Sequence, residues 1–217
     1  ASASVALLDV LTSLADVASR YGYVKPIVDD SSVIDIKEGR HPAVEQMIGE
    51  GLFVSNSTLL DTVSRSMLII TGPNMSGKST YMRQTAIIVL MAQIGSFVPC
   101  EHAHIGAVDR VFTRIGASDN LSHGQSTFYI EMSELANILR NATERSLIIL
   151  DEIGRGTSTF DGLSIAWATI EFLSKPGNCI RTMFATHYHE LTVLESKYAN
   201  VKNLSVAVSE QGSDIVF

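Results

Sequence analysis

The segment Gly72-Pro-Asn-Met-Ser-Gly-Lys-Ser79 fits the pattern Gly-x-x-x-x-Gly-Lys-Ser/Thr, a loop that wraps phosphate groups. It follows the apolar run Met67-Leu-Ile-Ile70 and precedes a segment of helical character. The glycines let backbone N–H groups turn toward phosphates, and the positive end of the following helix points at the same negative charge. Chance is the alternative, but the placement between a strand and a helix argues against it. The segment therefore predicts a nucleoside triphosphate site.

Residues of this loop have separate expected roles. Lys78 is expected to reach the β- and γ-phosphates, and Ser79 is expected to bind Mg²⁺. The other loop residues expected around the nucleotide are Gly72, Pro73, Asn74, Met75, Ser76, Gly77 and Thr80.

The composition limits the class of protein. The chain has 217 residues, of which 46% are hydrophobic and 18% charged, so a folded α/β domain is expected and disorder is not. A net charge of −7 repels a phosphate backbone, so other segments would hold any nucleic acid. Cys100 and Cys179 are far apart and predict neither a disulfide framework nor a metal site. We expect no apolar stretch of transmembrane length, no signal peptide and an intracellular protein.

Periodicity predicts an α/β fold. Helical spacing covers residues 4–21, and a strand over 33–37 leads to a turn over 37–42, inside a small β-rich entry region that extends to about residue 62. Further strands are expected over 67–70, 109–115, 146–150 and 179–185, and helices over 80–94, 126–141, 161–174 and 187–194. Strands that alternate with helices predict a largely parallel sheet flanked by helices.

Polar residues follow the buried strands, where open α/β sheets bind their ligands. Asp151 suits a direct or indirect Mg²⁺ carboxylate, and Glu152 can orient or deprotonate an attacking water. A solvated turn is the plain alternative for this acidic pair. His187 can donate a hydrogen bond to a γ-phosphate or to that water, or it can simply be satisfied by local backbone.

Other polar patterns are weaker. Ser126 at a helix start has the geometry of an anion site, although spacing alone favours a plain helix cap. His187-x-His189-Glu190 and Cys100-x-His102-x-His104 lack a second cluster at zinc spacing and are assigned to local structure. Asp151-x-x-Gly154 fits a GTPase pattern, but the Asn-Lys-x-Asp motif that reads guanine does not occur.

Four motifs in one order resemble the ATPase domain of the MutS family of DNA mismatch repair proteins. They are Gly72-Pro-Asn-Met-Ser-Gly-Lys-Ser-Thr80, Gln125-Ser-Thr-Phe128, Asp151-Glu-Ile-Gly-Arg-Gly-Thr-Ser-Thr-Phe-Asp-Gly162 and Phe184-Ala-Thr-His-Tyr-His-Glu-Leu191. The resemblance covers nearly the whole chain and implies a P-loop NTPase of the ABC ATPase class. Residues 1–22 resemble the end of a helical lever, and residues 23–217 resemble the ATPase domain. One departure is Ser76, where the family most often has glycine, which predicts backbone strain if φ must be positive there.

The resemblance also implies roles for residues. Active sites are shared between two copies, so Ser126 would reach the γ-phosphate bound by the partner's loop, and residues 154–159 would lie at the interface. Phe53 stands where the family has an aromatic against adenine, Asn74 lies near the nucleotide, and His187 matches a switch histidine. Phe128-Tyr-Ile-Glu131 resembles a mismatch-reading segment only superficially, because it falls on a core-facing helix.

The function implied is ATP hydrolysis to ADP with Mg²⁺, slow in isolation, that switches a DNA clamp. Implied partners are a second copy, as homodimer or family heterodimer, mismatched duplex DNA held by other domains, and downstream repair factors, but no membrane. The expected location is the bacterial cytoplasm with the nucleoid, or the nucleus in a eukaryote. A nucleotide-regulated binding module with incidental chemistry is the second hypothesis, and a phosphotransferase is the third.

Overall fold

Two compact units make up the structure, a computed structural model that describes residues 2–49, 52–73, 76–115, 127–206, 209–211 and 214–216. The first unit comprises residues up to 59 and 83–107, and nearly all of the second lies within residues 60–82 and 108–215. Helix α3 (Lys78–Gln93) begins in the second unit and continues into the first.

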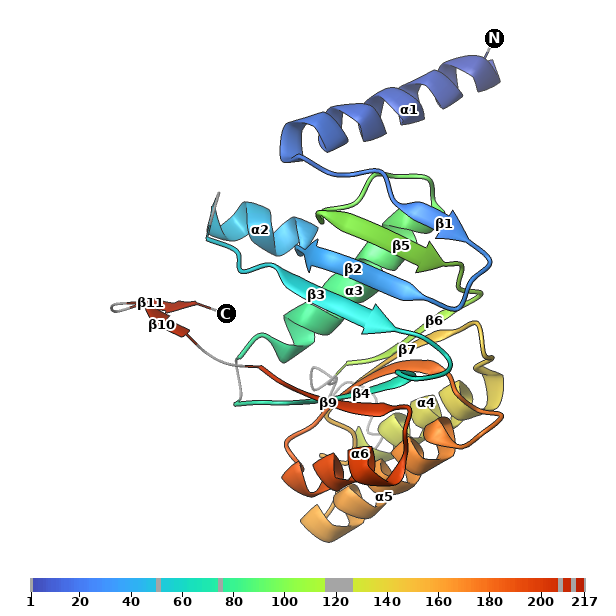
Figure 1. The fold of residues 1–217 in the computed structure, drawn as a ribbon, viewed down its shortest axis with the longest axis vertical. Coiled ribbons are helices and arrows are strands. Elements are labelled where there is room, and N and C mark those ends of the chain that lie inside the picture. The colour runs from blue at the N-terminus through green and yellow to red at the C-terminus, as the bar shows by residue number, and fades with distance from the viewer. Residues whose placement is uncertain are drawn as a thin grey trace. The chain divides into compact units, whose positions relative to one another are not determined.

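The first unit contains a four-stranded mixed sheet in the order β1-β5-β2-β3 (Figure 1). Its strands are β1 (Ile27–Asp29), β2 (Ile34–Gly39), β3 (Asn56–Leu60) and β5 (His102–Gly106). Strand β5 runs parallel to β1 and antiparallel to β2. Helices α1 (Ser2–Tyr21) and α2 (Pro42–Ile48) belong to the same unit. The expected β-rich entry region is therefore present.

The second unit contains a five-stranded sheet in the order β6-β7-β8-β4-β9, all of whose pairings are parallel. The strands are β4 (Met67–Thr71), β6 (Val111–Arg114), β7 (Leu147–Asp151), β8 (Arg181–Ala185) and β9 (Val201–Ser205). Strand β8 separates β4 from β7, so the phosphate loop strand and the Asp151 strand are not neighbours. The predicted parallel α/β sheet is confirmed.

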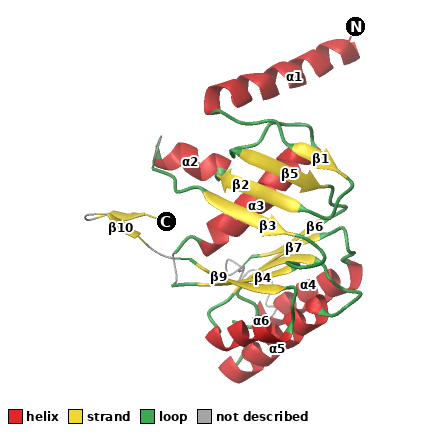
Figure 2. Ribbon diagram, in the orientation of Figure 1, coloured by secondary structure: helices red, strands yellow, loops and turns green. Residues whose placement is uncertain are grey.

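Helices cover one face of the five-stranded sheet (Figure 2). They are α4 (Thr127–Asn141), α5 (Thr159–Ser174), the 3-10 helix η2 (His189–Val193) and α6 (Leu194–Lys197). Buried side chains such as Ile148, Ile170 and Phe184 from these strands and helices form one core. Every residue of β4, β7 and β8 is buried, as their near-continuous apolar sequences require of a parallel sheet.

Two predicted segments differ from the structure. The turn expected over residues 37–42 is instead the end of β2, which continues to Gly39, followed by α2. Pro42 stands at the start of α2, where its fixed φ suits a helix, and His41 Nδ1 accepts a hydrogen bond from the Val44 N–H at 3.3 Å. The helix expected over 187–194 is the 3-10 helix η2 continued by α6.

The remaining short strands lie near the C-terminus. Strands β10 (Ser209–Gln211) and β11 (Asp214–Val216) pair as a two-stranded sheet.

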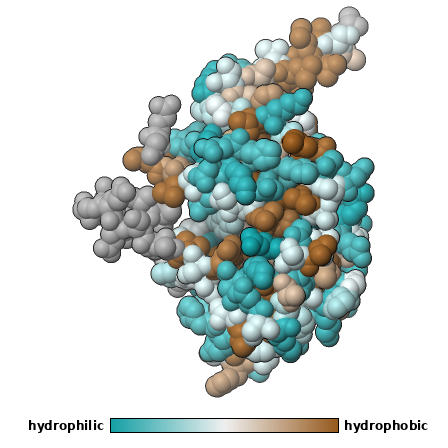
Figure 3. Space-filling view, viewed as in Figure 1, coloured by the Kyte–Doolittle hydropathy of each residue, from teal (hydrophilic) through white to brown (hydrophobic). Residues whose placement is uncertain are grey.

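Helix α1 has most of its apolar side chains exposed, among them Val5 and Leu8, each 66% exposed (Figure 3). Its 20 residues include an 18-residue window with a mean hydropathy of 1.3, which is long and apolar enough to cross a membrane, so the expectation that no stretch reaches that length is wrong. One such helix is weak evidence for a membrane span, because core helices and signal sequences meet the same criterion.

Candidate nucleotide site at the carboxyl edge of the parallel sheet

Three strand ends of the second unit lie level with one another. Ile70 of β4 and Asp151 of β7 both pair with Ala185 of β8. The backbone continues this alignment past the strands, since Thr186 N–H donates to Ile70 O and Glu152 N–H donates to Ala185 O, both at 3.0 Å. The phosphate loop, the acidic pair and the Thr186-His187 segment therefore leave the sheet at the same edge, as predicted.

Lys78 is buried within its own loop. Only 5% exposed, it donates hydrogen bonds from Nζ to Gly72 O at 2.8 Å and to Pro73 O at 2.6 Å. Gly72 and Gly77 have φ values of 149° and 88°, which favour glycine. A Cβ at Gly72 would also lie 3.0 Å from Val206 O. The loop thus depends on both glycines for its backbone course.

Ser76 does not show the strain that its departure from the family pattern predicted. In the described part of the chain, the only residues other than glycine with positive φ are Glu38 and Glu152. Ser76 is 1% exposed, and within the described part of the chain its Oγ has no hydrogen-bond partner. Asn74 and Met75, also expected at the nucleotide, lie outside the described residues.

Ser79 and Asp151 meet across the sheet edge. Ser79 Oγ donates a hydrogen bond to Asp151 Oδ2 at 2.5 Å, and Asp151 is only 7% exposed. Asp151 Oδ1 is buried and has no hydrogen-bond partner among the described residues. A hydroxyl and a carboxylate with an unused buried oxygen match the hard oxygen ligands that Mg²⁺ takes from proteins. The residues present therefore fit this ion.

Glu152 has an unusual backbone and a charged partner. Its φ is 56°, in a region that non-glycine residues seldom occupy and that often marks functional sites. Arg155 Nη1 lies 2.7 Å from Glu152 Oε2, and the Arg155 side chain is 54% exposed while that of Glu152 is 15% exposed. Sequence reasoning missed Arg155 as a partner, although opposite charges three residues apart were a visible signal.

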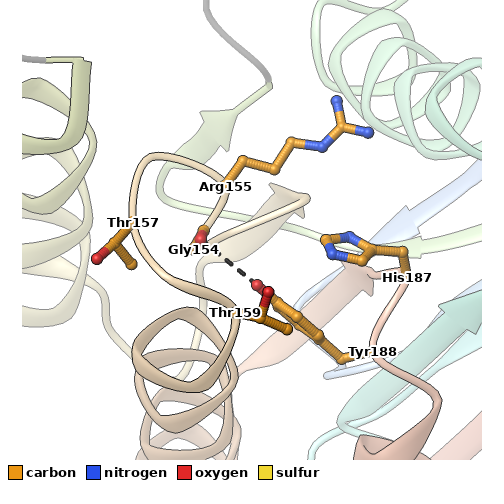
Figure 4. Close-up of a pocket in the computed structure, with 6 residues that line it drawn as sticks. All are labelled: Gly154, Arg155, Thr157, Thr159, His187 and Tyr188. Carbon is orange, nitrogen blue, oxygen red and sulfur yellow. Dashed lines mark hydrogen bonds between the residues drawn. The ribbon is translucent and has the colours of Figure 1, made fainter.

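A polar cavity of about 250 Å³ lies beside this acidic pair, lined by Gly154, Arg155, Thr157, Thr159, His187 and Tyr188 (Figure 4). The ring of the exposed His187 contacts that of Tyr188, with centroids 4.1 Å apart and ring planes tilted by 39°. Tyr188 is 5% exposed, and burial raises the pKa of its hydroxyl, with the charge of Glu131 adding to the effect. His187 thus lines this cavity and is exposed to solvent.

Three more of the expected site residues lie in other parts of the chain. Ser126 lies outside the described residues, immediately before α4. Phe53 is half-buried in the loop between α2 and β3, in the first unit. Thr80 lies in the first turn of α3.

The two weak histidine patterns fall on ordinary elements. His189 and Glu190 are exposed in η2. His104 lies on β5 and its Nε2 is 2.8 Å from Asp29 Oδ2. Among the described residues, no group of three or more metal-binding side chains comes together.

Comparison with known proteins matches residues 68–217 to a family model described as MutS domain V. The chain belongs to the MutS family. Domain V is the ATPase domain of that family. This MutS-family chain is 64% identical over 215 residues to the DNA mismatch repair protein MutS of Lachnoclostridium phytofermentans, with 99% of the chain and 23% of the relative covered.

Other MutS relatives give the same picture. The MutS of Acetivibrio thermocellus is 62% identical over 214 residues, covering 99% of this chain and 24% of that protein. The MutS of Caldicellulosiruptor bescii is 59% identical over 217 residues, covering 100% of this chain and 25% of that protein. The chain thus spans about a quarter of the length of these relatives.

Proposed function

We propose that this chain binds ATP with Mg²⁺ and hydrolyses it to ADP and phosphate, as the ATPase domain of a DNA mismatch repair protein. The observation that carries the proposal is the contact of Ser79 Oγ with Asp151 Oδ2 at 2.5 Å, which joins the phosphate loop to the acidic strand end. The match to MutS domain V supports the same assignment.

Lys78, Ser79 and Asp151 would hold the nucleotide and its metal. Lys78 Nζ rests on two carbonyls of its own loop, and phosphate oxygens would replace them with stronger, charge-assisted hydrogen bonds. Asp151 Oδ1 and Ser79 Oγ offer oxygen ligands for Mg²⁺. The ion, when bound, neutralises charge on the β- and γ-phosphates.

Glu152 would serve as the base. It would take a proton from the water that attacks the γ-phosphorus, while the bond to the bridging oxygen of ADP breaks. Arg155 pairs with Glu152 Oε2, so Glu152 would accept the proton on its other carboxylate oxygen, or on Oε2 after this ion pair opens. His187 would donate a hydrogen bond to the γ-phosphate or to the water.

A second copy of the domain would complete each site. Ser126 would reach the γ-phosphate held by the partner's phosphate loop, and Phe53 would pack on adenine. Contacts to one ATP from both copies would favour the closed pair, which allows ATP to shift the conformation of a DNA clamp.

The longer protein would supply the remaining partners. Residues 1–22 would form the end of a helical lever that enters the ATPase domain at residues 23–217. Mismatched duplex DNA would bind to other domains, which agrees with the net charge of −7 here. The longer protein would also bind downstream repair factors. Its location would be the cytoplasm and nucleoid of a bacterium, which the bacterial relatives support.

The test is Glu152→Gln, with Glu190→Gln as the control at a nearby exposed position. Loss of the base is expected to lower steady-state ATP hydrolysis about 100-fold or more while ATP still binds, since general bases contribute roughly that factor. The control is expected to retain full turnover. Equal hydrolysis by Glu152→Gln and the unaltered chain would remove Glu152 from this role.

A nucleotide-regulated binding module is the second candidate, and the Arg155–Glu152 ion pair favours it by occupying the carboxylate. Hydrolysis measured against protein concentration separates the two. A rate per chain that climbs with concentration supports shared catalytic sites, whereas binding without turnover at every concentration supports the module.

A further inference from the structure

Glu131 is a buried acid on the core-facing side of α4. It is 5% exposed, and its Oε1 accepts a hydrogen bond from the Gly154 N–H at 2.5 Å. Arg114 of β6, itself buried, lies 4.0 Å from the other Glu131 oxygen and 2.8 Å from the Glu134 carboxylate. A carboxylate is kept at such a position only with partners, and the backbone N–H of Gly154 is its closest one.

Gly154 is held from its other sides as well. Its carbonyl accepts a hydrogen bond from the Tyr188 hydroxyl at 3.4 Å (Figure 4). A Cβ at Gly154 would lie 2.6 Å from Gly162 Cα in α5, so the loop packs directly against that helix. With φ at 95°, Gly154 has a conformation that glycine alone adopts freely. Its position is therefore defined by α4, α5 and the segment after β8 together.

In the sequence, Gly154 lies between Glu152 and Arg155, the two members of the ion pair. Glu152 lies two residues before Gly154 and has a φ of 56°, and Arg155 follows directly. Because one short chain segment carries Glu152, Gly154 and Arg155, moving the Gly154 peptide would also shift Glu152 and Arg155. The bond from Gly154 to Glu131 thus restrains the direction of the Glu152 carboxylate from outside the loop.

We propose that Glu131 is a positioning residue, which aims Glu152 through the Gly154 amide. The inference rests on the proposed function, in which Glu152 accepts a proton from water. Glu131 itself touches none of the reacting atoms. Its influence is confined to turnover, because Lys78, Ser79 and Asp151 hold the nucleotide and do not contact it.

The experiment compares ATP hydrolysis and ATP binding in the unaltered chain, in Glu131→Met and in Glu131→Gln. Methionine fills similar space without accepting the bond, and kcat is expected to fall at least about tenfold, since small misplacements of catalytic groups cost up to about 100-fold. The Kd for ATP is expected to stay within about twofold, by the same argument that only orientation changes. Glutamine retains an acceptor oxygen, so Glu131→Gln is expected to keep most of the activity.

Glu134→Ala is the matched control. Glu134 lies on the same helix as Glu131 and also pairs with Arg114, whereas the Gly154 N–H donates to Glu131. The control is expected to keep kcat. The Gly154 amide proton, followed by NMR, is expected to move upfield in Glu131→Met and to remain in place in Glu134→Ala. This signal reports the hydrogen bond without depending on turnover.

The outcomes separate the two proposals. No hydrolysis by the unaltered chain at any concentration defeats the proposed function, and this inference with it. Hydrolysis by the unaltered chain with an equal kcat in Glu131→Met defeats the inference alone. If kcat and ATP binding are lost together in both Glu131 variants, Glu131 has a structural role only, and the inference is overturned.

Discussion

Ser79 Oγ and Asp151 Oδ2 are joined by a hydrogen bond of 2.5 Å, although 72 positions separate the residues in the chain. The parallel register explains the contact, because Ile70 and Asp151 both pair with Ala185. The buried Asp151 Oδ1, which has no partner among the described residues, completes a set of oxygens suited to a small divalent cation.

Asp151→Asn is expected to weaken the effect of Mg²⁺ on ATP affinity. The amide lacks the charge that attracts the cation, so the ratio of Kd values in EDTA and in Mg²⁺ should shrink about tenfold, or roughly 1.4 kcal/mol. Calorimetry in EDTA and in Mg²⁺ measures this ratio, and a substitution at an exposed position, Glu144→Gln, is the control. An unchanged ratio in Asp151→Asn would falsify the metal assignment.

Gly162→Ala is expected to destabilise the second unit by about 2 kcal/mol, as overpacking does. Alanine ordinarily favours a helix, but here its Cβ would overlap the Tyr188 hydroxyl and Gly154 O. Urea unfolding measures the change. Ser164→Ala, exposed in the same helix, is expected to stay within about 0.5 kcal/mol. If both variants are equally stable, the close packing of α5 on the loop is not required.

Cys100 is expected to resist thiol reagents in the folded protein. It is 1% exposed, and burial raises its pKa to about 11. At pH 8 roughly one thiol in a thousand is then a thiolate, the reactive form. The half-exposed Cys179 should therefore react first, and Cys100 only in denaturant. Labelling of Cys179→Ser measures Cys100 alone, and rapid native labelling there would contradict its burial.

Asp29 is expected to give the first unit a pH-dependent stability. Hydrogen bonds from Ser31 and then from His104 lower the Asp29 pKa from 3.8 to about 2. The folded state thus favours the carboxylate, so the added stability is present above pH 3.8 and is lost as the pH falls toward 2. Urea midpoints of the unaltered chain and Asp29→Asn should converge over this range. A gap that stays constant down to pH 2 contradicts the assignment.

Several elements were predictable because their signals are local. The run Leu147-Ile-Ile-Leu150 indicated a strand buried on both faces, and β7 is such a strand. The loop after β4 was predicted to bind phosphate from its glycines and Lys78, and this stays a prediction. Helix α2 was missed, because a glycine and a proline close together resemble a turn, whereas here Pro42 starts a helix that His41 caps.

Contacts between residues that are distant in the chain were harder to predict from the sequence. Glu131 follows Phe128 by three residues and precedes Leu135 by four, in a segment that was predicted to form a core-facing helix. That it accepts the Gly154 N–H, 23 residues later, could not be read from this spacing. Nor could any local pattern tell that β8 separates β4 from β7.

The order of residues was sufficient to predict that Lys78, Ser79 and Asp151 belong to one site, because each prediction follows from a short pattern next to an apolar strand. Folding settled which groups restrain Glu152. Those restraints arise where α4, α5 and the end of β8 converge on Gly154, and such contacts depend on packing between segments that are distant in the chain.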